Sequence, residues 1–193
     1  MTTLAVLFSG GGRTILNLLD HIEDGKLNAN IVLAIASRDD ISGIDRLAER
    51  CVDVAVAKQD GDSPDIIDAR VQAWLENARP DLILLCGYLR LLKIEPWMQG
   101  RVLNIHPALL PNFGGKGMYG MHVHNAVLQS GCEQSGCTVH YVDEEYDHGP
   151  TILLETCTIE EGETAQSLAD KVFSLECKAY PVAIRKVAAQ LKV

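Results

Sequence analysis

Short apolar runs alternate with segments of helical periodicity over the first half of the chain. Continuous apolar runs predict buried strands at 4–8, 31–37, 52–57, 81–87 and 101–106. Apolar positions that recur every three to four residues predict helices between them, at 15–25, 43–51 and 62–80. The last helix is the clearest, because Ser63 suits an N-cap and Pro64 a first helical residue. Buried strands separated by helices are typical of a parallel sheet covered on both faces.

The pattern changes after residue 120. A helix is predicted at 121–131, and two alternating segments, 136–143 and 150–159, predict an antiparallel pair. Residues 164–193 are helical through most of their length, and we expect Pro181 to kink or break this helix. The fold class expected is therefore α/β, with an open, mostly parallel but mixed sheet flanked by helices. No linker or repeat marks a boundary, which predicts a single domain over 1–193.

Composition narrows the classes of function. The 193 residues are 47% hydrophobic and carry a net charge of −9, which argues against a general nucleic-acid binder. No apolar stretch approaches the ~20 residues that cross a bilayer. The first residues also lack the basic region of a secretory signal, so a cytoplasmic location is expected. Most of the six cysteines lie in apolar runs and are expected to be buried thiols. A zinc site at Cys132, Cys137 and His140 stays open, but no second ligand pair has finger-like spacing, so no metal is predicted.

Three consecutive glycines, residues 10–12, follow the first strand and precede a helix. Glycines let the backbone approach a ligand closely, and a helix N-terminus favours an anion. The dinucleotide fingerprint would need glycine at position 15, which is Ile15, and the P-loop motif is absent. We therefore expect a phosphomonoester on a small substrate, with a plain tight turn as the alternative.

Polar residues stand at the exits of the later strands. Asn104 and His106 are two residues apart and share one face of their strand. If strand exits lie together, Arg90 and Asp147 converge with this pair. Asn104 can donate to an oxyanion, and His106 can move a proton. Asp147 is expected to raise the pKa of His106 and orient its ring. This set predicts a reaction through a tetrahedral intermediate, with protonated His106 supporting the oxyanion.

Five segments occur in the order and spacing of the folate-dependent formyltransferases: FSGGG, GYLRLL, LNIHPALLP, GCTVHYVDEEYDHGP and ECKAYP. The chain resembles this family from Leu4 to about Ile184, most of all the members that act on glycinamide ribonucleotide. The resemblance implies a Rossmann-like formyltransferase fold. It also implies transfer of a formyl group from the cosubstrate 10-formyltetrahydrofolate to the amine of glycinamide ribonucleotide, in de novo purine biosynthesis.

The resemblance further implies roles for individual residues. The family's catalytic asparagine, histidine and aspartate fall on Asn104, His106 and Asp147. Its substrate-phosphate loop falls on Gly11, Gly12, Arg13 and Thr14, and its ribose-binding acid on Glu176. Its folate pocket falls on Leu89, Arg90, Leu91, Leu92, Asn104, Asp143, Glu144, Glu145, Tyr146 and Asp147. The partners expected are small molecules rather than nucleic acid or membrane, with the chain a monomer or a homodimer.

Three departures from the family's pattern leave alternatives open. Arg13 stands where serine is common, Pro64 where some members have a basic folate contact, and 113–124 is longer than the usual loop. Lys116 in that loop could meet a phosphate. The alternatives are a formyltransferase for an amino-sugar nucleotide and a formyltetrahydrofolate hydrolase, which usually carries a further N-terminal domain. The third alternative is a non-catalytic nucleotide-binding module, whose function would not require Asn104, His106 and Asp147.

Overall fold

A computed structural model of the chain describes residues 1–191. The chain divides into two compact units. Unit 1 comprises residues 1–92 together with the end of the chain from Ala188, and unit 2 comprises residues 93–187. The expectation of a single domain over 1–193 stays a prediction.

Unit 1 contains four parallel strands, in the order β3-β2-β1-β4. They are β1 (Thr2–Phe8), β2 (Ala29–Ala36), β3 (Val54–Val56) and β4 (Leu82–Leu85). The side chains of β1 from Leu4 to Phe8 are completely buried on both faces. This burial explains why β1 reads as one continuous apolar run rather than as an alternation. Strand β3 has three residues instead of the six that the sequence predicts.

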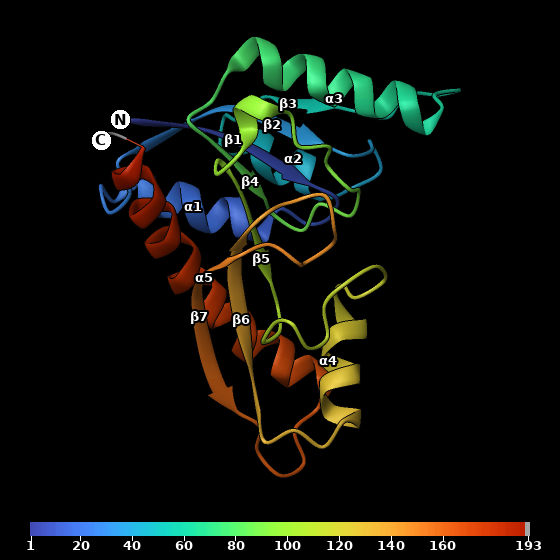
Figure 1. Cartoon of the computed structure of the whole chain (residues 1–193), viewed down its shortest axis with the longest axis vertical. Helices are drawn as coiled ribbons and strands as arrows, with labels where there is room; N and C mark the ends of the chain where they lie inside the picture. The colour runs from blue at the N-terminus through green and yellow to red at the C-terminus, as the bar shows by residue number, and fades with distance from the viewer. Residues whose placement is uncertain (192–193) are drawn as a thin grey trace. The chain divides into compact units, whose positions relative to one another are not determined.

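Three helices connect these strands: α1 (Arg13–Glu23), α2 (Gly43–Ala48) and α3 (Pro64–Ala78). Figure 1 shows α1 and α3 on opposite sides of the strands of unit 1. The side-chain oxygen of Ser63 caps α3 by accepting from the Ile66 amide, and Pro64 occupies the first turn, so both expectations are confirmed. Helix α2 ends earlier than expected, because Cys51 takes a left-handed conformation with φ 56° and turns the chain.

Unit 2 contains three antiparallel strands in the order β5-β6-β7. They are β5 (Val102–His106), β6 (Gln134–Tyr141) and β7 (Thr151–Thr158). The helical elements are the 3₁₀ turn η1 (Pro96–Met98), α4 (Met121–Gln129) and most of α5 (Ala165–Gln190). The expected α/β class is confirmed, with a mostly parallel but mixed strand set and flanking helices.

Pro181 was expected to kink or break α5. Helix α5 continues through Pro181, so it is not broken there, and a kink stays a prediction. Proline removes one backbone hydrogen bond, which costs about 3 kcal/mol in an isolated helix interior. Here Tyr180 next to it is completely buried and donates its hydroxyl to the Leu103 carbonyl at 3.0 Å. Lys186 further along donates to the Ile152 carbonyl at 3.1 Å. Packing on both sides of Pro181 therefore holds the helix together.

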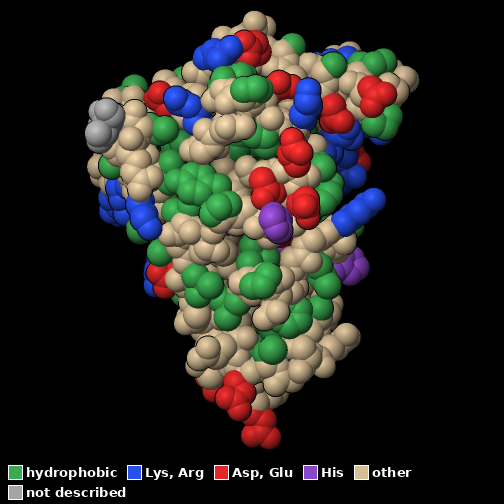
Figure 2. Space-filling view, viewed as in Figure 1, with side chains coloured by type: hydrophobic (Ala, Val, Ile, Leu, Met, Phe, Trp, Pro, Cys, Tyr) green, Lys and Arg blue, Asp and Glu red, His purple; other side chains and the backbone are tan. Residues whose placement is uncertain are grey.

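Figure 2 shows acidic and basic side chains interspersed in the upper part of the face in view, whereas hydrophobic and uncharged groups cover most of its lower part. The part of the chain that the structure describes contains no helix both long and apolar enough to span a bilayer. Cys51 and Cys132 are exposed free thiols, whereas Cys86 and Cys137 are buried. Within residues 1–191, no group of three or more His, Cys, Asp or Glu could hold a metal ion.

Candidate active site

Strand β5 carries Asn104 and His106 on one face, as the two-residue spacing predicts. Leu103 and Ile105, which point the other way, are buried apolar side chains. In the antiparallel register Asn104 lies opposite His140, and His106 lies opposite Thr138 of β6. The buried Thr138 hydroxyl donates to the Ala108 carbonyl at 2.7 Å, which fixes the path of the chain directly after β5.

Asp147 reaches this face of β5 from the loop between β6 and β7. Its Oδ1 accepts from Asn104 Nδ2 at 3.1 Å, and its Oδ2 lies 3.4 Å from His106 Nδ1. The Gly115 amide donates to the same Oδ2 at 2.9 Å. The structure therefore brings Asn104, His106 and Asp147 together, although Asp147 follows His106 by forty-one positions (147 − 106).

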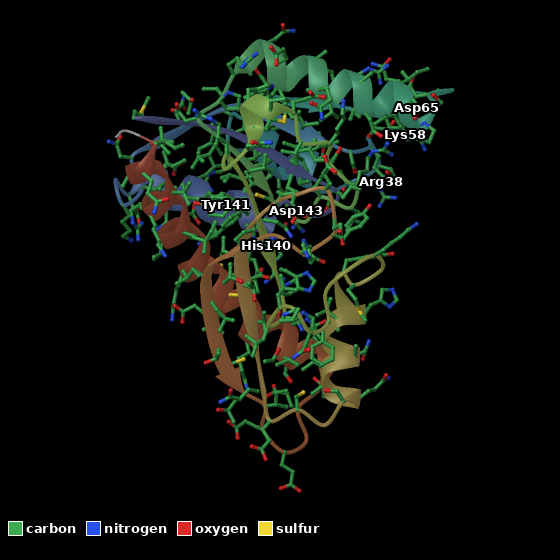
Figure 3. The ribbon with its side chains drawn as sticks, in the orientation of Figure 1. Arg38, Lys58, Asp65, His140, Tyr141 and Asp143 are labelled. Atoms are coloured by element: carbon green, nitrogen blue, oxygen red, sulfur yellow. The ribbon has the colours of Figure 1, made fainter. Side chains whose placement is uncertain are left out.

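A second histidine, His140, belongs to this cluster and was missed from the sequence. Its Nδ1 lies 2.8 Å from the Tyr141 carbonyl, and its Nε2 lies 3.1 Å from Asn104 Nδ2. Because a carbonyl only accepts, Nδ1 carries the proton and Nε2 accepts from Asn104. Figure 3 labels His140 and Tyr141 where β6 leads into the Asp147 loop. The sequence feature that could have identified His140 is its position in the predicted antiparallel strand 136–143, which pairs with β5.

The electrostatics of His106 differ from the sequence-based expectation. Burial lowers the pKa of His106, and the negative charge of Asp147 offsets this effect only in part. Asp147 thus acts on the pKa in the expected direction, but desolvation of the nearly inaccessible ring outweighs the carboxylate, and the pKa of His106 lies below its usual value. Burial alone would raise the pKa of Asp147, but His140, His106 and the Gly115 amide together hold it below its usual value. The resting pair is thus a neutral imidazole beside a carboxylate.

A third buried histidine, His124 on α4, lies near His106. Burial lowers the pKa of His124, and protonation of His106 lowers it further. Its Nδ1 has no hydrogen-bond partner among the described residues. His122 and His124 are only two positions apart near the start of α4, yet His122 is exposed and His124 is buried. The sequence alone does not show which of the two is buried.

A cavity of about 300 Å³ lies in unit 2 beside Asp147. Its walls come from Leu110, Pro111, Gly114 and Gly115 on one side and from residues 145–149 and Thr151 on the other. The volume is at the lower end of the range for small-molecule sites. Of the expected folate-contacting loop, Glu145, Tyr146 and Asp147 line this cavity. The Asp143 carboxylate instead forms hydrogen bonds within its own loop: it accepts from the Glu145 amide and contacts His148 Nδ1.

The glycine loop lies in unit 1, where Gly12 is the left-handed N-cap of α1 with φ 70°. The loop packs directly on the start of α2, since a side chain at Gly43 would come within 2.6 Å of the Gly10 carbonyl. Arg46 of α2 donates to the Gly11 carbonyl at 3.1 Å. Gly11, Gly12, Arg13 and Thr14 thus lie at the N-terminus of an eleven-residue helix, with Arg13 exposed.

The loop after β4 lies beside the glycine loop in unit 1. Ser9 Oγ accepts from the Leu89 amide at 3.0 Å, and the Ser9 amide donates to the Gly87 carbonyl at 3.1 Å. The strand order reverses between β1 and β4, and ligands of such sheets bind beyond the carboxyl ends at this reversal. Leu89 and Leu91 expose 45% and 42% of their surface there, which leaves apolar area for a ligand.

Two further predicted residues have defined surroundings. The Arg90 guanidinium donates to Asp68 at 2.6 Å and to the Pro64 carbonyl at 3.1 Å, all within unit 1. The expected place of Arg90 beside Asn104, His106 and Asp147 stays a prediction.

Glu176 is half-buried on α5, near Cys137 of β6. Burial and the nearby Glu176 raise the pKa of Cys137 to about 12. This thiol is consequently held in its neutral, unreactive form.

Comparison with known proteins agrees with this arrangement. Residues 2–184 match the formyl transferase family. Phosphoribosylglycinamide formyltransferase, chloroplastic, of Arabidopsis thaliana is 39% identical over 186 residues, covering 92% of this chain. This chain spans only 62% of that relative's length. The crystal structure of phosphoribosylglycinamide formyltransferase from Brucella melitensis is 34% identical, has a TM-score of 0.86, and is matched over 97% of this chain and 96% of that one.

Glycinamide ribonucleotide transformylase 1 from Symbiobacterium toebii gives a similar result. Its crystal structure is 33% identical, with a TM-score of 0.84, and the match covers 96% of this chain and 86% of that one. The family match extends over almost the whole chain and includes the Asn104, His106 and Asp147 cluster. The chain therefore belongs to the formyl transferase family.

Proposed function

We propose that this chain transfers a formyl group from 10-formyltetrahydrofolate to the amine of glycinamide ribonucleotide, a step of de novo purine biosynthesis. The observation that carries the proposal is the hydrogen-bonded cluster of Asn104, His106 and Asp147 beside a small cavity. The names of the relatives, phosphoribosylglycinamide formyltransferase and glycinamide ribonucleotide transformylase, support this choice of substrate.

In the proposed reaction, the substrate amine attacks the formyl carbon, and the carbonyl oxygen becomes an oxyanion. Both N–H groups of Asn104 are engaged at rest, one by His140 and one by Asp147. One of them turns to the oxyanion when the substrate binds. Neutral His106 accepts the proton from the amine, and Asp147 stabilises the imidazolium that forms. The intermediate then collapses: the bond from carbon to N10 of the folate breaks, and N10 receives that proton.

The substrate's phosphate is proposed to bind at the N-terminus of α1, at Gly11–Thr14, where the helix dipole and the Arg13 guanidinium favour a dianion. Glu176 is proposed as the ribose-binding acid. For the folate, the exposed Leu89 and Leu91 and the Asp143–Asp147 loop are the proposed contacts. Each of these assignments follows from the family pattern.

Assembly and location accompany this proposal as predictions. The partners are proposed to be the two small molecules, with the chain a monomer or a homodimer, which analytical ultracentrifugation would distinguish. A cytoplasmic location is likewise a prediction, and fractionation of the source cells with an antibody to the chain would test it.

The deciding experiment is a formyl-transfer assay with 10-formyltetrahydrofolate and three acceptors: glycinamide ribonucleotide, an amino-sugar nucleotide, and none. Transfer to glycinamide ribonucleotide alone is expected. Transfer to the amino sugar would identify the first alternative, and formate release without an acceptor would identify a hydrolase. His106→Ala and Asp147→Asn should each lower kcat by at least about a hundredfold. Near-normal kcat in both variants would remove the roles proposed for these residues.

A further inference from the structure

Two residues that surround His106 have unusual backbone conformations. Phe113 has φ 57° and Asp147 has φ 55°. Only four residues other than glycine have positive φ among residues 1–191, and two of them contact the same imidazole. A residue with a large side chain, such as phenylalanine, rarely adopts this backbone conformation. The conformation persists only where surrounding contacts hold it, and residues held in this way cluster at functional sites.

The Phe113 carbonyl has a definite partner. Its oxygen lies 2.8 Å from His106 Nε2, which is a normal hydrogen-bond distance. A carbonyl oxygen has no proton to give, so Nε2 must carry the proton of the neutral ring. The lone pair is then left on Nδ1, which lies 3.4 Å from Asp147 Oδ2. One backbone group thus selects the tautomer of His106.

The segment around Phe113 is itself held in place. The Gly115 amide donates to Asp147 Oδ2 at 2.9 Å, so residues 113–115 contact both members of the catalytic pair. A side chain at Gly114 would come within 2.6 Å of Leu110 Cδ2 and 3.1 Å of Asp147 Cβ. The absence of a side chain at Gly114 therefore lets the segment pack against Asp147 and keep the carbonyl aimed at the ring.

We propose that Phe113 is a positioning residue for His106: its left-handed backbone directs the carbonyl at Nε2 and makes Nδ1 the nitrogen that takes up and returns the proton. The role in proton transfer rests on the proposed function, whereas the tautomer is a property of the resting protein. The ionisable groups around the ring are Asp147, His140 of β6 and His124 of α4. Asp147 faces Nδ1, where the new positive charge would form.

The first test measures the tautomer by nitrogen NMR of protein labelled with ¹⁵N-histidine, at about pH 8.5, where the neutral ring dominates. His106→Gln identifies which of the six histidine signals belongs to His106. The expected spectrum has a protonated Nε2 and an unprotonated Nδ1. A protonated Nδ1 would overturn the proposal. Because no substrate is needed, this result stands apart from any failure of the formyl-transfer assay.

The second test varies the backbone preference at position 113. Phe113→Gly tolerates the left-handed conformation, whereas Phe113→Val opposes it. The valine variant should show a mixture of tautomers and a kcat lowered by about tenfold or more, with KM within about threefold of wild type. The glycine variant should keep the wild-type tautomer, and Asn112→Val, an exposed neighbour, should keep both tautomer and kcat.

An unchanged tautomer in Phe113→Val would show that the carbonyl does not select it, and the proposal would fail. A lowered kcat with equal loss in Asn112→Val would likewise count against it, since the effect would belong to the loop as a whole. If Phe113→Val does not fold, the wild-type spectrum and the Phe113→Gly variant still decide the question.

Discussion

Asn104 Nδ2 lies 3.1 Å from His140 Nε2, across neighbouring positions of β5 and β6. The same amide nitrogen also donates to Asp147 Oδ1, so both of its protons are used. Neither of the two groups that fix the amide is adjacent to it in sequence. The orientation of Asn104, and with it any donation to an oxyanion, therefore depends on the ring of His140.

Replacing His140 with phenylalanine should test this dependence. The apolar ring fills the buried site but accepts no hydrogen bond, which leaves one Asn104 N–H unpaired at a cost of about 1–3 kcal/mol. We expect the variant to lose stability of this size and about tenfold in kcat, which corresponds to about 1.4 kcal/mol. Chemical denaturation and steady-state kinetics measure the two effects. His122→Phe, at an exposed histidine of α4, should change neither. A full kcat in His140→Phe would refute the link.

Replacing Asp147 with asparagine should lower kcat without a matching loss of folding stability. In Asp147→Asn the amide oxygen can still accept from Gly115, so the loop is expected to keep its structure. The negative charge opposite His106 is lost, and kcat should fall by about a hundredfold or more while KM changes little. Asp53→Asn, at an exposed aspartate, is the matched control. Equal losses in kcat and in folding stability would point to a structural role instead.

Much of this arrangement follows from local sequence. Apolar runs identify the strands, and the spacing of Asn104 and His106 places them on one face. Three features depend on tertiary contacts that no local pattern encodes. The contribution of His140 requires the β5–β6 register, and the pKa of His106 is set by burial rather than by its charged neighbour. Helix α5 continues through Pro181 because its neighbours are packed.

Gly43 should control the shape of the glycine loop. A methyl group at this position would come within 2.6 Å of the Gly10 carbonyl and 2.7 Å of the Phe8 ring. Gly43→Ala is therefore expected to displace the loop, at a cost of about 1–3 kcal/mol in stability. Because the proposed phosphate site is displaced, KM for glycinamide ribonucleotide should rise more than kcat falls. Asp45→Ala, an exposed change on the same helix, should leave KM unaltered. An unchanged KM in Gly43→Ala would contradict this view of the loop.

Acid should destabilise the chain through its buried histidines. Burial lowers the pKa of both His106 and His124 below the ordinary histidine value of 6.5, so the unfolded chain binds protons more readily. Well above pH 6.5 the two histidines do not affect stability, because they are neutral in both states. As the pH falls from 6.5 through their lower folded-state pKa, they destabilise the folded chain increasingly. Substitution of His124 by glutamine removes one of the two groups. The loss of unfolding free energy between about pH 7 and pH 5 should therefore be smaller in His124→Gln.

His148 provides a control of opposite sign. Its hydrogen bond and ion pair with Asp143 raise the pKa of His148 above 6.5, so this contact stabilises the folded chain at low pH and is lost as the pH rises through the folded pKa. The pair is exposed, and the effect is correspondingly small. His148→Gln should therefore make acid destabilisation slightly larger, whereas His124→Gln makes it smaller. Urea denaturation of both variants at the two pH values measures the difference, and a shift of the same sign in both would exclude the buried histidines as its cause.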